Sequence, residues 1–256
     1  MTRGPVLRAL AGVAGFLLVA EILSLTVVDP LVLPRASAVI AEAARLLTGG
    51  DFLSDVADTL GACALGLLLA AAAAVPLGVL LGTLRPVERS ALPLVEFLRP
   101  IPAVALIPVA QFLFFDPGDA KVALVVFASS WPILFNTVYG MRDVDPVAKD
   151  TLRGFGFGPV AVVVRVSLPS AAPFIATGVR IAASVTLIVA VSVELFAGGT
   201  GIGVYLTEAS AGNQRVAMIA AIVWTGVIGV LVNAVLAGTE RRLFRWHHLR
   251  TAGERR

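Results

Sequence analysis

Residues 141–173, MRDVDPVAKDTLRGFGFGPVAVVVRVSLPSAAP, form a polar to amphipathic island in a chain that is otherwise mostly apolar. Asp145–Pro146 is suited to begin a helix, because a carboxylate favours the helix N-terminus and proline tolerates the first helical position. The glycines at residues 154–158 should end this helix, because glycine weakens a helix and accepts left-handed backbone. A second short helix is expected over residues 159–166, with Leu168–Pro169 ending it. The sequence therefore predicts a helix–turn–helix and not an unstructured loop.

The amino-acid composition indicates a membrane protein. Of the 256 residues, 58% are hydrophobic and 14% are charged, whereas about a quarter of the residues of a soluble domain are charged. The mean hydropathy of +0.92 points the same way. The formal net charge of +3 is informative through its distribution and does not indicate a nucleic-acid partner. Cys63 is the only cysteine, so it forms no disulfide within the chain and is expected to be a small buried apolar residue.

Six apolar segments are long enough to cross a bilayer, which takes roughly 20 residues in a helix. They cover residues 9–28, 59–84, 92–115, 122–141, 174–197 and 216–239. The second, fourth and sixth contain no charged residue. The predicted fold class is therefore all-α: one polytopic membrane domain over residues 1–256 with about six transmembrane helices, ending in a mobile tail over residues 247–256.

The first and third segments have special features. Arg3 and Arg8 before an apolar run are also typical of a signal peptide. A poor cleavage site, and an apolar run that resumes after Glu21, favour an uncleaved span. In the third segment, Pro100 and Pro102 prevent a regular helix, because each proline removes an amide donor and clashes with the preceding turn. Broken helices of this kind usually line protein cavities and not lipid.

The connections between the spans are predicted to be short. Residues 36–47 read as an amphipathic helix, ended by Gly49–Gly50, that either lies on the membrane surface or packs on the bundle. Residues 85–89 are expected to form a turn that makes the second and third spans neighbours, and residues 116–119 to form a turn on the outer side. The spacing Gly78-x-x-x-Gly82 permits close helix contact.

The basic residues predict the orientation in the membrane. Lysine and arginine are enriched on the cytoplasmic side of membrane proteins. With the N-terminus inside, sixteen of the twenty basic residues fall in inner regions, namely 1–8, 85–99, 142–180 and 241–256. Both termini and residues 142–169 of the island are therefore expected in the cytoplasm.

A spaced motif runs through the island: Asp150-Thr151-Leu152, three residues, Gly156, nine residues, then Val166-x-Leu168-Pro169. It resembles the EAA signature of ABC-importer permease subunits, although Asp-Thr-Leu stands in place of Glu-Ala-Ala. In that family the cytoplasmic helix–turn–helix docks into a groove on the ATPase and transmits its movement. The resemblance implies that the residues coupling this chain to an ATPase are Asp150, Thr151, Leu152, Arg153, Gly156, Val166, Leu168 and Pro169.

Residues 98–115, LRPIPAVALIPVAQFLFF, are similar to the third-span signature of the nitrate/sulfonate/taurine branch of these permeases. This resemblance, over about residues 30–246, implies a type I ABC importer permease fold in the bacterial inner membrane. It also implies a homodimer, two ABC ATPase subunits and an extracytoplasmic substrate-binding protein. ATP and Mg would bind the partner ATPase and no cofactor would bind this chain. The cargo would be a small solute such as a nitrate-, sulfonate- or taurine-like anion.

Four polar side chains within or beside the spans are candidates for the translocation path or its gate. Arg99 could attract an anionic substrate, or instead pair with Glu96 or reach lipid phosphate. Ser130 and Asn136 lie in the fourth span, where Asn136 either lines the path or joins two helices. Glu194 either acts in gating or docking, or makes a structural hydrogen bond.

The sequence lacks the residues that several kinds of chemistry require. His247 and His248 are the only histidines, so no inward-facing histidine metal cluster is expected. The segment GTGIG at 199–203 lacks the Lys-Ser/Thr of a phosphate loop. The chain is therefore not expected to be an enzyme, and an ATPase would be a separate polypeptide. An alternative is a proton-coupled secondary transporter using Glu21 or Glu194, but no repeat of broken helices is visible and the island would be unexplained. A scaffold or an intramembrane enzyme is a further alternative, and the latter would need a reactive pair of residues.

Overall fold

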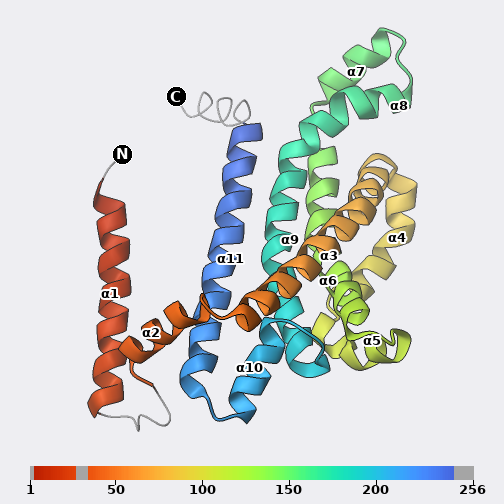
Figure 1. The fold of residues 1–256 in the computed structure, drawn as a ribbon. Coiled ribbons are helices and arrows are strands. Elements are labelled where there is room, and N and C mark those ends of the chain that lie inside the picture. Colours follow the sequence, from red (N-terminus) through yellow and green to blue (C-terminus); the bar gives the residue numbers. More distant parts are fainter. Residues whose placement is uncertain (1–2, 27–33, 245–256) are drawn as a thin grey trace.

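The structure, a computed structural model, describes residues 3–26 and 34–244. Within these ranges the chain is helical and contains no β-strand, as the all-α prediction requires (Figure 1). The helices are α1 (Arg3–Thr26), α2 (Ala36–Leu46), α3 (Gly50–Thr83), α4 (Arg85–Leu98), η1 (Ala103–Leu106), α5 (Ile107–Leu113), α6 (Pro117–Arg142), α7 (Pro146–Gly154), α8 (Pro159–Val162), the π-helical turn η2 (Val163–Ser167), α9 (Leu168–Ala197), α10 (Ile202–Ala211) and α11 (Arg215–Leu243). The expected mobile tail over residues 247–256 lies outside the described residues.

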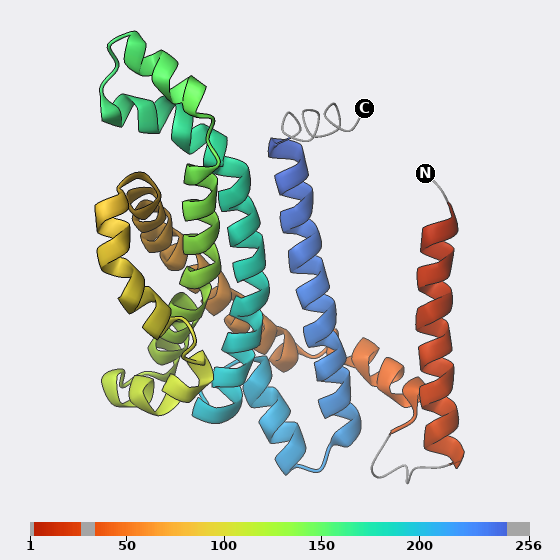
Figure 2. The same cartoon turned by 180° about the vertical axis from the view of Figure 1, so that it is seen from behind.

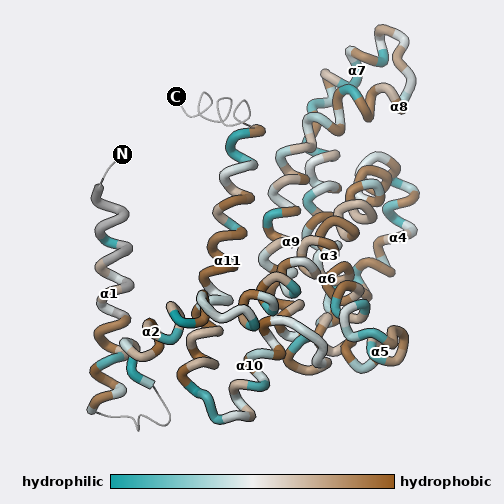
Figure 3. Tube along the Cα trace, viewed as in Figure 1, coloured by the Kyte–Doolittle hydropathy of each residue, from teal (hydrophilic) through white to brown (hydrophobic). Residues whose placement is uncertain are grey.

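Four helices in the described part of the chain are long and apolar enough to cross a membrane. They are α3, α6, α9 with the short helices before it, and α11, and the bent pair α4 and η1–α5 supplies a fifth if it counts as one span. Figure 3 shows the apolar residues concentrated along these helices, with polar residues on α2, on α7 and at the ends of the bundle. Of α1, only Leu17–Thr26 is identified as an apolar helix, so the predicted first span stays a prediction.

Helices α3, α6 and α9 pack side by side at the centre of the molecule (Figures 1 and 2). Small residues permit this close contact. A Cβ atom added to Gly78 would lie 2.6 Å from the Cβ of Thr137, and one added to Gly82 would lie 2.6 Å from the Cβ of Met141. Gly78-x-x-x-Gly82 is therefore the surface through which α3 approaches α6.

The predicted break in the third apolar segment is confirmed. Helix α4 stops at Leu98, the chain turns through the Pro100–Pro102 region, and η1–α5 leaves at 81° to α4. The expected turn over residues 85–89 is wrong, because Arg85 already begins α4 and Leu84 alone separates it from α3. The physical reason is that Pro86 lies in the first turn of a helix, where its missing amide costs no hydrogen bond.

The outer turn predicted over residues 116–119 is also wrong, for the same reason. Pro117 begins α6, and the Asp116 side chain accepts a hydrogen bond of 3.1 Å from the backbone N–H of Asp119. Asp116 is therefore the N-cap of the helix. An Asp-Pro pair is compatible with both a turn and a helix start, and here the long apolar run that follows favours the helix.

Helix α2 packs on the bundle, which is the second of the two alternatives predicted for this segment. Val39 and Leu46 are buried, and the indole Nε1 of Trp224 in α11 donates a hydrogen bond of 2.8 Å to the carbonyl of Ala43. At its other end, the Glu21 carboxylate of α1 accepts hydrogen bonds from the N–H and the hydroxyl of Ser37. Glu21 thus caps the start of α2, while α1 itself stands apart from the remaining helices (Figures 1 and 2).

The helix–turn–helix predicted for the island is confirmed, but its proline stop is not. Leu168 and Pro169 lie in the first turn of α9, so α8, η2 and α9 run on without a break. The wider π-helical turn at Val163–Ser167 directly precedes the proline. Pro169 lacks the amide that would continue the hydrogen-bond ladder, and the wide turn before it leaves room for its ring, so the helix continues through the proline.

Candidate functional site

Helix α7 projects from the bundle and is bounded by two local motifs. At its start, the Asp145 carboxylate accepts a hydrogen bond of 2.8 Å from the N–H of Val147. At its end, Phe157 N–H donates to the carbonyl of Leu152 and Gly156 N–H donates to that of Arg153. Gly156 has a φ of +81°. This combination is a Schellman turn, in which a glycine takes the left-handed position and satisfies the last carbonyl groups of the helix.

The residues predicted to couple to an ATPase lie together on this projection and at its base. Asp150 and Arg153 form an ion pair of 3.0 Å whose side chains are 68% and 62% exposed. Thr151 is exposed and its hydroxyl donates to the carbonyl of Val147. Leu152, Val166 and Leu168 are half-buried, whereas Gly156 and Pro169 are exposed. The charged and hydroxyl side chains of the motif are therefore exposed, and its Leu and Val side chains are half-buried.

Apolar side chains are also exposed on the projection, and the sequence analysis did not single them out. The exposed fractions are 70% for Val147, 78% for Phe155, 75% for Val160 and 56% for Val164. We call these four residues the α7–α8 apolar surface. The signal in the sequence was present, because an amphipathic helix–turn–helix with valine and phenylalanine on its outer side needs a partner for that side.

One further contact joins α7 to the bundle. Lys149, on the inner side of α7, donates a hydrogen bond of 3.3 Å from Nζ to the backbone carbonyl of Met141 at the end of α6. A movement of α7 would therefore act directly on α6 as well as on α9, with which the island is continuous.

The four residues predicted for the translocation path are not brought together. The Arg99 guanidinium lies 4.6 Å from the centre of the Phe135 ring, and Glu96 is not its partner in an ion pair of the described residues. Ser130 and Asn136 donate to backbone carbonyls of their own helix, at Val126 and Pro132. Their place in the translocation path stays a prediction.

Glu194 lies in a separate, buried cluster at the opposite end of the bundle. Its side chain is completely buried and forms an ion pair of 2.9 Å with Lys121, whose side chain is 7% exposed. The hydroxyl of Thr59 donates to the carboxylate at 2.9 Å, and the N–H of Gly203 donates at 2.9 Å. Lys121 also donates to the carbonyl of Thr200 at 3.0 Å. We call Thr59, Lys121, Glu194, Thr200 and Gly203 the glutamate cluster.

The glutamate cluster joins four elements of the fold. Its members come from α3, α6, α9 and α10, with Thr200 in the segment that leads into α10. The Thr59 hydroxyl also accepts from the N–H of Ile202, and Asp55 accepts from the N–H of Gly201. The glycine segment 199–203 is thus held in place by hydrogen bonds to side chains of α3, α6 and α9. Sequence reasoning selected Glu194 but missed Lys121, although a lysine near the end of an apolar segment was a visible signal for a buried pair.

Among residues 3–26 and 34–244, no group of three or more histidine, cysteine, aspartate and glutamate side chains could hold a metal ion. Cys63 is buried in the apolar core beside α6 and α9, as expected for a small apolar residue.

Known proteins resemble this chain in both sequence and fold. It is 29% identical over 182 residues to the nitrate import permease protein NrtB of Leptolyngbya laminosa, covering 71% of this chain and 65% of NrtB. It is 28% identical over 251 residues to the bicarbonate transport system permease protein CmpB of Synechococcus elongatus, covering 94% of this chain and 90% of CmpB. A protein named for aliphatic sulfonates transport, SsuC of Bacillus subtilis, is 27% identical over 224 residues, or 88% of this chain and 81% of SsuC.

The fold matches a solved type I importer permease. An inward-facing structure of the MetNI methionine ABC transporter superposes with a TM-score of 0.67 at 19% identity, covering 75% of this chain and 95% of that one. The family model for the binding-protein-dependent transport system inner membrane component matches residues 74–245, a range that contains the broken α4–α5 span, the α7–α8 projection and the glutamate cluster except Thr59. The chain is an ABC transporter permease and belongs to the family of binding-protein-dependent transport system inner membrane components.

Proposed function

We propose that this permease couples to a separate ABC ATPase through α7 and α8, and that two copies of it enclose the path of a small oxyanion. The observation that carries the coupling proposal is the α7–α8 apolar surface. Val147, Phe155 and Val160 are each at least 70% exposed, on a projection fixed by the Asp145 cap and the Gly156 turn. An exposed apolar patch with a polar rim is typical of a protein-binding site.

The geometry supports transmission of movement from this surface. The projection continues through η2 into α9 without a break, and Lys149 joins it to α6. Both α6 and α9 belong to the central packed group with α3. A rigid displacement of α7 therefore shifts two core helices together, as an alternating-access movement driven by two ATPase subunits requires. ATP and Mg are assigned to those partners.

The orientation is proposed from the distribution of charge. Figures 1 and 2 place α7–α8, the α3–α4 junction and the end of α11 toward one end of the bundle, with α5 and α10 at the other. The first end carries most of the basic residues, so it is assigned to the cytoplasm and both termini with it. A substrate-binding protein would then deliver solute at the α5–α10 end.

The substrate class is proposed from the relatives. NrtB, CmpB and SsuC are named for nitrate, bicarbonate and aliphatic sulfonates, which share a small oxyanion head. Arg99, at the break between α4 and η1, offers a guanidinium at the point where a span is interrupted. Guanidinium groups bind oxyanions through paired hydrogen bonds. The proton-coupled alternative has less support, because Glu21 caps α2 and Glu194 is paired with Lys121.

A charge placed on the α7–α8 apolar surface tests the coupling. Val160→Asp should weaken binding of the ATPase by about 30-fold, the effect of losing about 2 kcal/mol at a contact hot spot. The measurement is co-purification of the tagged ATPase, followed by ATP-driven uptake of nitrate, bicarbonate or an alkanesulfonate in proteoliposomes with the binding protein.

Phe115→Asp is the matched control. Phe115 is fully exposed and follows α5, which lies at the end of the bundle away from α7–α8 (Figure 1), so this variant should retain the ATPase. Normal ATPase binding by Val160→Asp would refute the proposed docking surface.

A further inference from the structure

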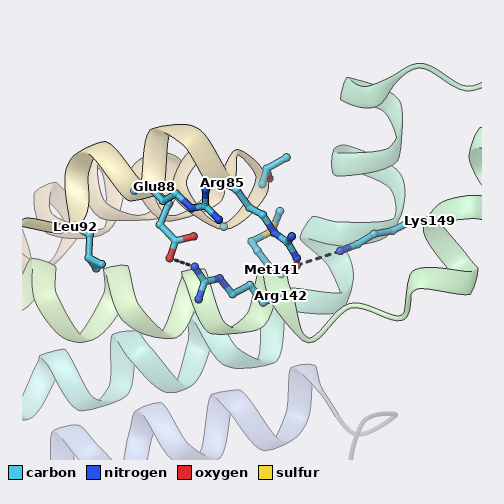
Figure 4. A pocket seen from close by; sticks show the side chains of 9 residues that line it. Arg85, Glu88, Leu92, Met141, Arg142 and Lys149 are labelled. Carbon is cyan, nitrogen blue, oxygen red and sulfur yellow. Dashed lines mark hydrogen bonds and ion pairs between the residues drawn. The ribbon is translucent and has the colours of Figure 1, made fainter.

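A basic cleft lies where the junction of α3 and α4 faces the end of α6 and the start of α7. It has a volume of about 580 Å³, and its charged lining residues are Arg85, Glu88, Arg89, Arg142 and Lys149. Four cations therefore face a single carboxylate. Figure 4 shows Glu88 pointing from α4 toward Arg142, with Arg85 on the same helix and Lys149 approaching from α7.

The charges in this cleft are only partly compensated by the protein. Glu88 forms an ion pair with Arg142, and Lys149 donates to the Met141 carbonyl. Within the described part of the chain, neither Arg85 nor Arg89 forms a side-chain hydrogen bond or an ion pair, and both are exposed. These two residues are four apart on one helix, so their guanidinium groups lie on the same face of α4. The cleft thus offers two free guanidinium groups to an anion.

The wall of the cleft becomes apolar toward the membrane-spanning part of the bundle. Leu92 and Met141 contribute to the lining. Leu92 lies on the same face of α4 as Arg85 and Arg89, and it is 43% exposed. A ligand with an anionic head and a long apolar tail would contact both the basic and the apolar parts of the cleft lining. A small free anion would contact only the basic part.

We propose that the basic cleft binds the phosphate headgroup of an anionic phospholipid, with Arg85 and Arg89 as its principal ligands and the acyl chains along α4. Basic pockets between transmembrane helices on the cytoplasmic side are suited to anionic headgroups. Arginine pairs with phosphate in a bidentate geometry. Because Arg142 and Lys149 connect this cleft to the ends of α6 and α7, the bound lipid would hold the base of the α7–α8 projection against α4.

The test measures binding of phosphatidylglycerol to the purified full-length protein in detergent by native mass spectrometry, with phosphatidylcholine of the same acyl chains as the comparison. The double variant Arg85→Gln/Arg89→Gln should bind phosphatidylglycerol about 25-fold more weakly, or about fivefold for each basic residue lost near an anionic lipid. Phosphatidylcholine binding should be unaffected.

Two further variants separate a specific site from general charge and from misfolding. Arg241→Gln/Arg242→Gln removes the same charge from the exposed last turn of α11 and should leave phosphatidylglycerol binding within about twofold of the parent, since these residues lie outside the cleft. Glu88→Gln removes the only carboxylate of the cleft lining and should strengthen binding up to about fivefold. A gain of affinity cannot result from a failure to fold.

The remaining outcomes would overturn the proposal. Equal binding of the two lipids, or equal losses in the two arginine double variants, would show that the cleft does not select an anionic headgroup. Displacement of phosphatidylglycerol by millimolar inorganic phosphate would identify a free-anion site instead. Loss of the lipid when the ATPase is added would show that a side chain of the partner protein occupies the cleft. The lipid-binding measurement does not depend on the proposed coupling, because it is made on the purified permease before any ATPase is added.

Discussion

At the α10 end of the bundle, Lys121 and Glu194 are buried, and the carboxylate accepts hydrogen bonds from three different groups. At the α7–α8 end, Asp150 and Arg153 form an ion pair of similar length that is more than half exposed, next to valine and phenylalanine side chains that nothing in the described chain covers. Buried polar groups must be satisfied internally, whereas exposed apolar groups indicate a partner. The polar groups of the first region are therefore satisfied within the fold, whereas the second region leaves apolar side chains exposed, as the proposed coupling requires.

The contrast between the two regions is tested most strongly at Lys121. Lys121→Met should lower the free energy of unfolding by about 3–5 kcal/mol, because it leaves a buried carboxylate without its cation. Chemical denaturation in detergent, followed by circular dichroism or tryptophan fluorescence, measures this loss.

The double variant Lys121→Met/Glu194→Gln is the control for Lys121→Met. A buried ion pair replaced as a whole by uncharged residues costs far less than a broken one, so the double variant should recover much of the stability. If Lys121→Met alone were as stable as the parent, the glutamate cluster would not hold the four elements together.

Gly203 tests the packing of the same cluster. A Cβ atom at this position would lie 2.5 Å from the Cβ of Glu194 and 2.5 Å from the carbonyl oxygen of Val191. Gly203→Ala should therefore destabilise the protein by about 1–3 kcal/mol, the usual cost of overpacking. Gly226→Ala in α11 is the matched change, since no atom lies within 4 Å of its added Cβ, and it should be neutral or stabilising by up to about 1 kcal/mol. Similar thermal unfolding of the two variants would contradict this packing.

The α7–α8 region could be predicted from the sequence more fully than the glutamate cluster. For α7, the local signals were sufficient: Asp145–Pro146 started the helix and Gly156 ended it, because caps and turns depend on neighbouring residues. For the glutamate cluster they were not, because Lys121 and Glu194 are 73 residues apart and come together only when α6 packs on α9. From the sequence, Glu194 was expected to need a polar partner, but the partner could not be identified.

The errors in predicting helix ends share one cause. Pro86, Pro117 and Pro169 were read as parts of turns or stops, and each lies in the first turn of a helix. Pro86 and Pro117 begin new helices, and proline is favourable at a helix N-terminus. At Pro169 the helix continues directly from the π-helical turn η2. Whether a helix stops or starts at a proline depends on how the residues that follow pack, and local composition does not reveal this packing.

Gly156 tests whether the α7–α8 region is locally organised. Its φ of +81° is unfavourable for any other residue, although no atom would crowd an added Cβ. Gly156→Ala should cost roughly 1–2 kcal/mol of backbone strain, and we expect this loss in the turn alone. Hydrogen exchange of the amides over residues 146–157 should become faster, while unfolding of the whole protein stays unchanged. Gly154→Ala, in the helical last turn of α7 with equally open surroundings, should not accelerate exchange; equal acceleration in both variants would exclude the turn as its origin.

The smallest effect is expected at Arg153, the exposed counterpart of Lys121. Arg153→Gln breaks the 3.0 Å ion pair with Asp150, but water solvates both groups, so the free energy of unfolding should fall by no more than about 0.5 kcal/mol. The difference between the parent and the variant should shrink further at high salt, because exposed charges are screened. The same denaturation experiment used for Lys121→Met measures both pairs on one scale. A loss at Arg153 as large as that at Lys121 would mean that burial does not distinguish the two ends of the bundle, whereas a loss several-fold smaller, with ATPase binding reduced, would show that Arg153 serves the partner and not the fold.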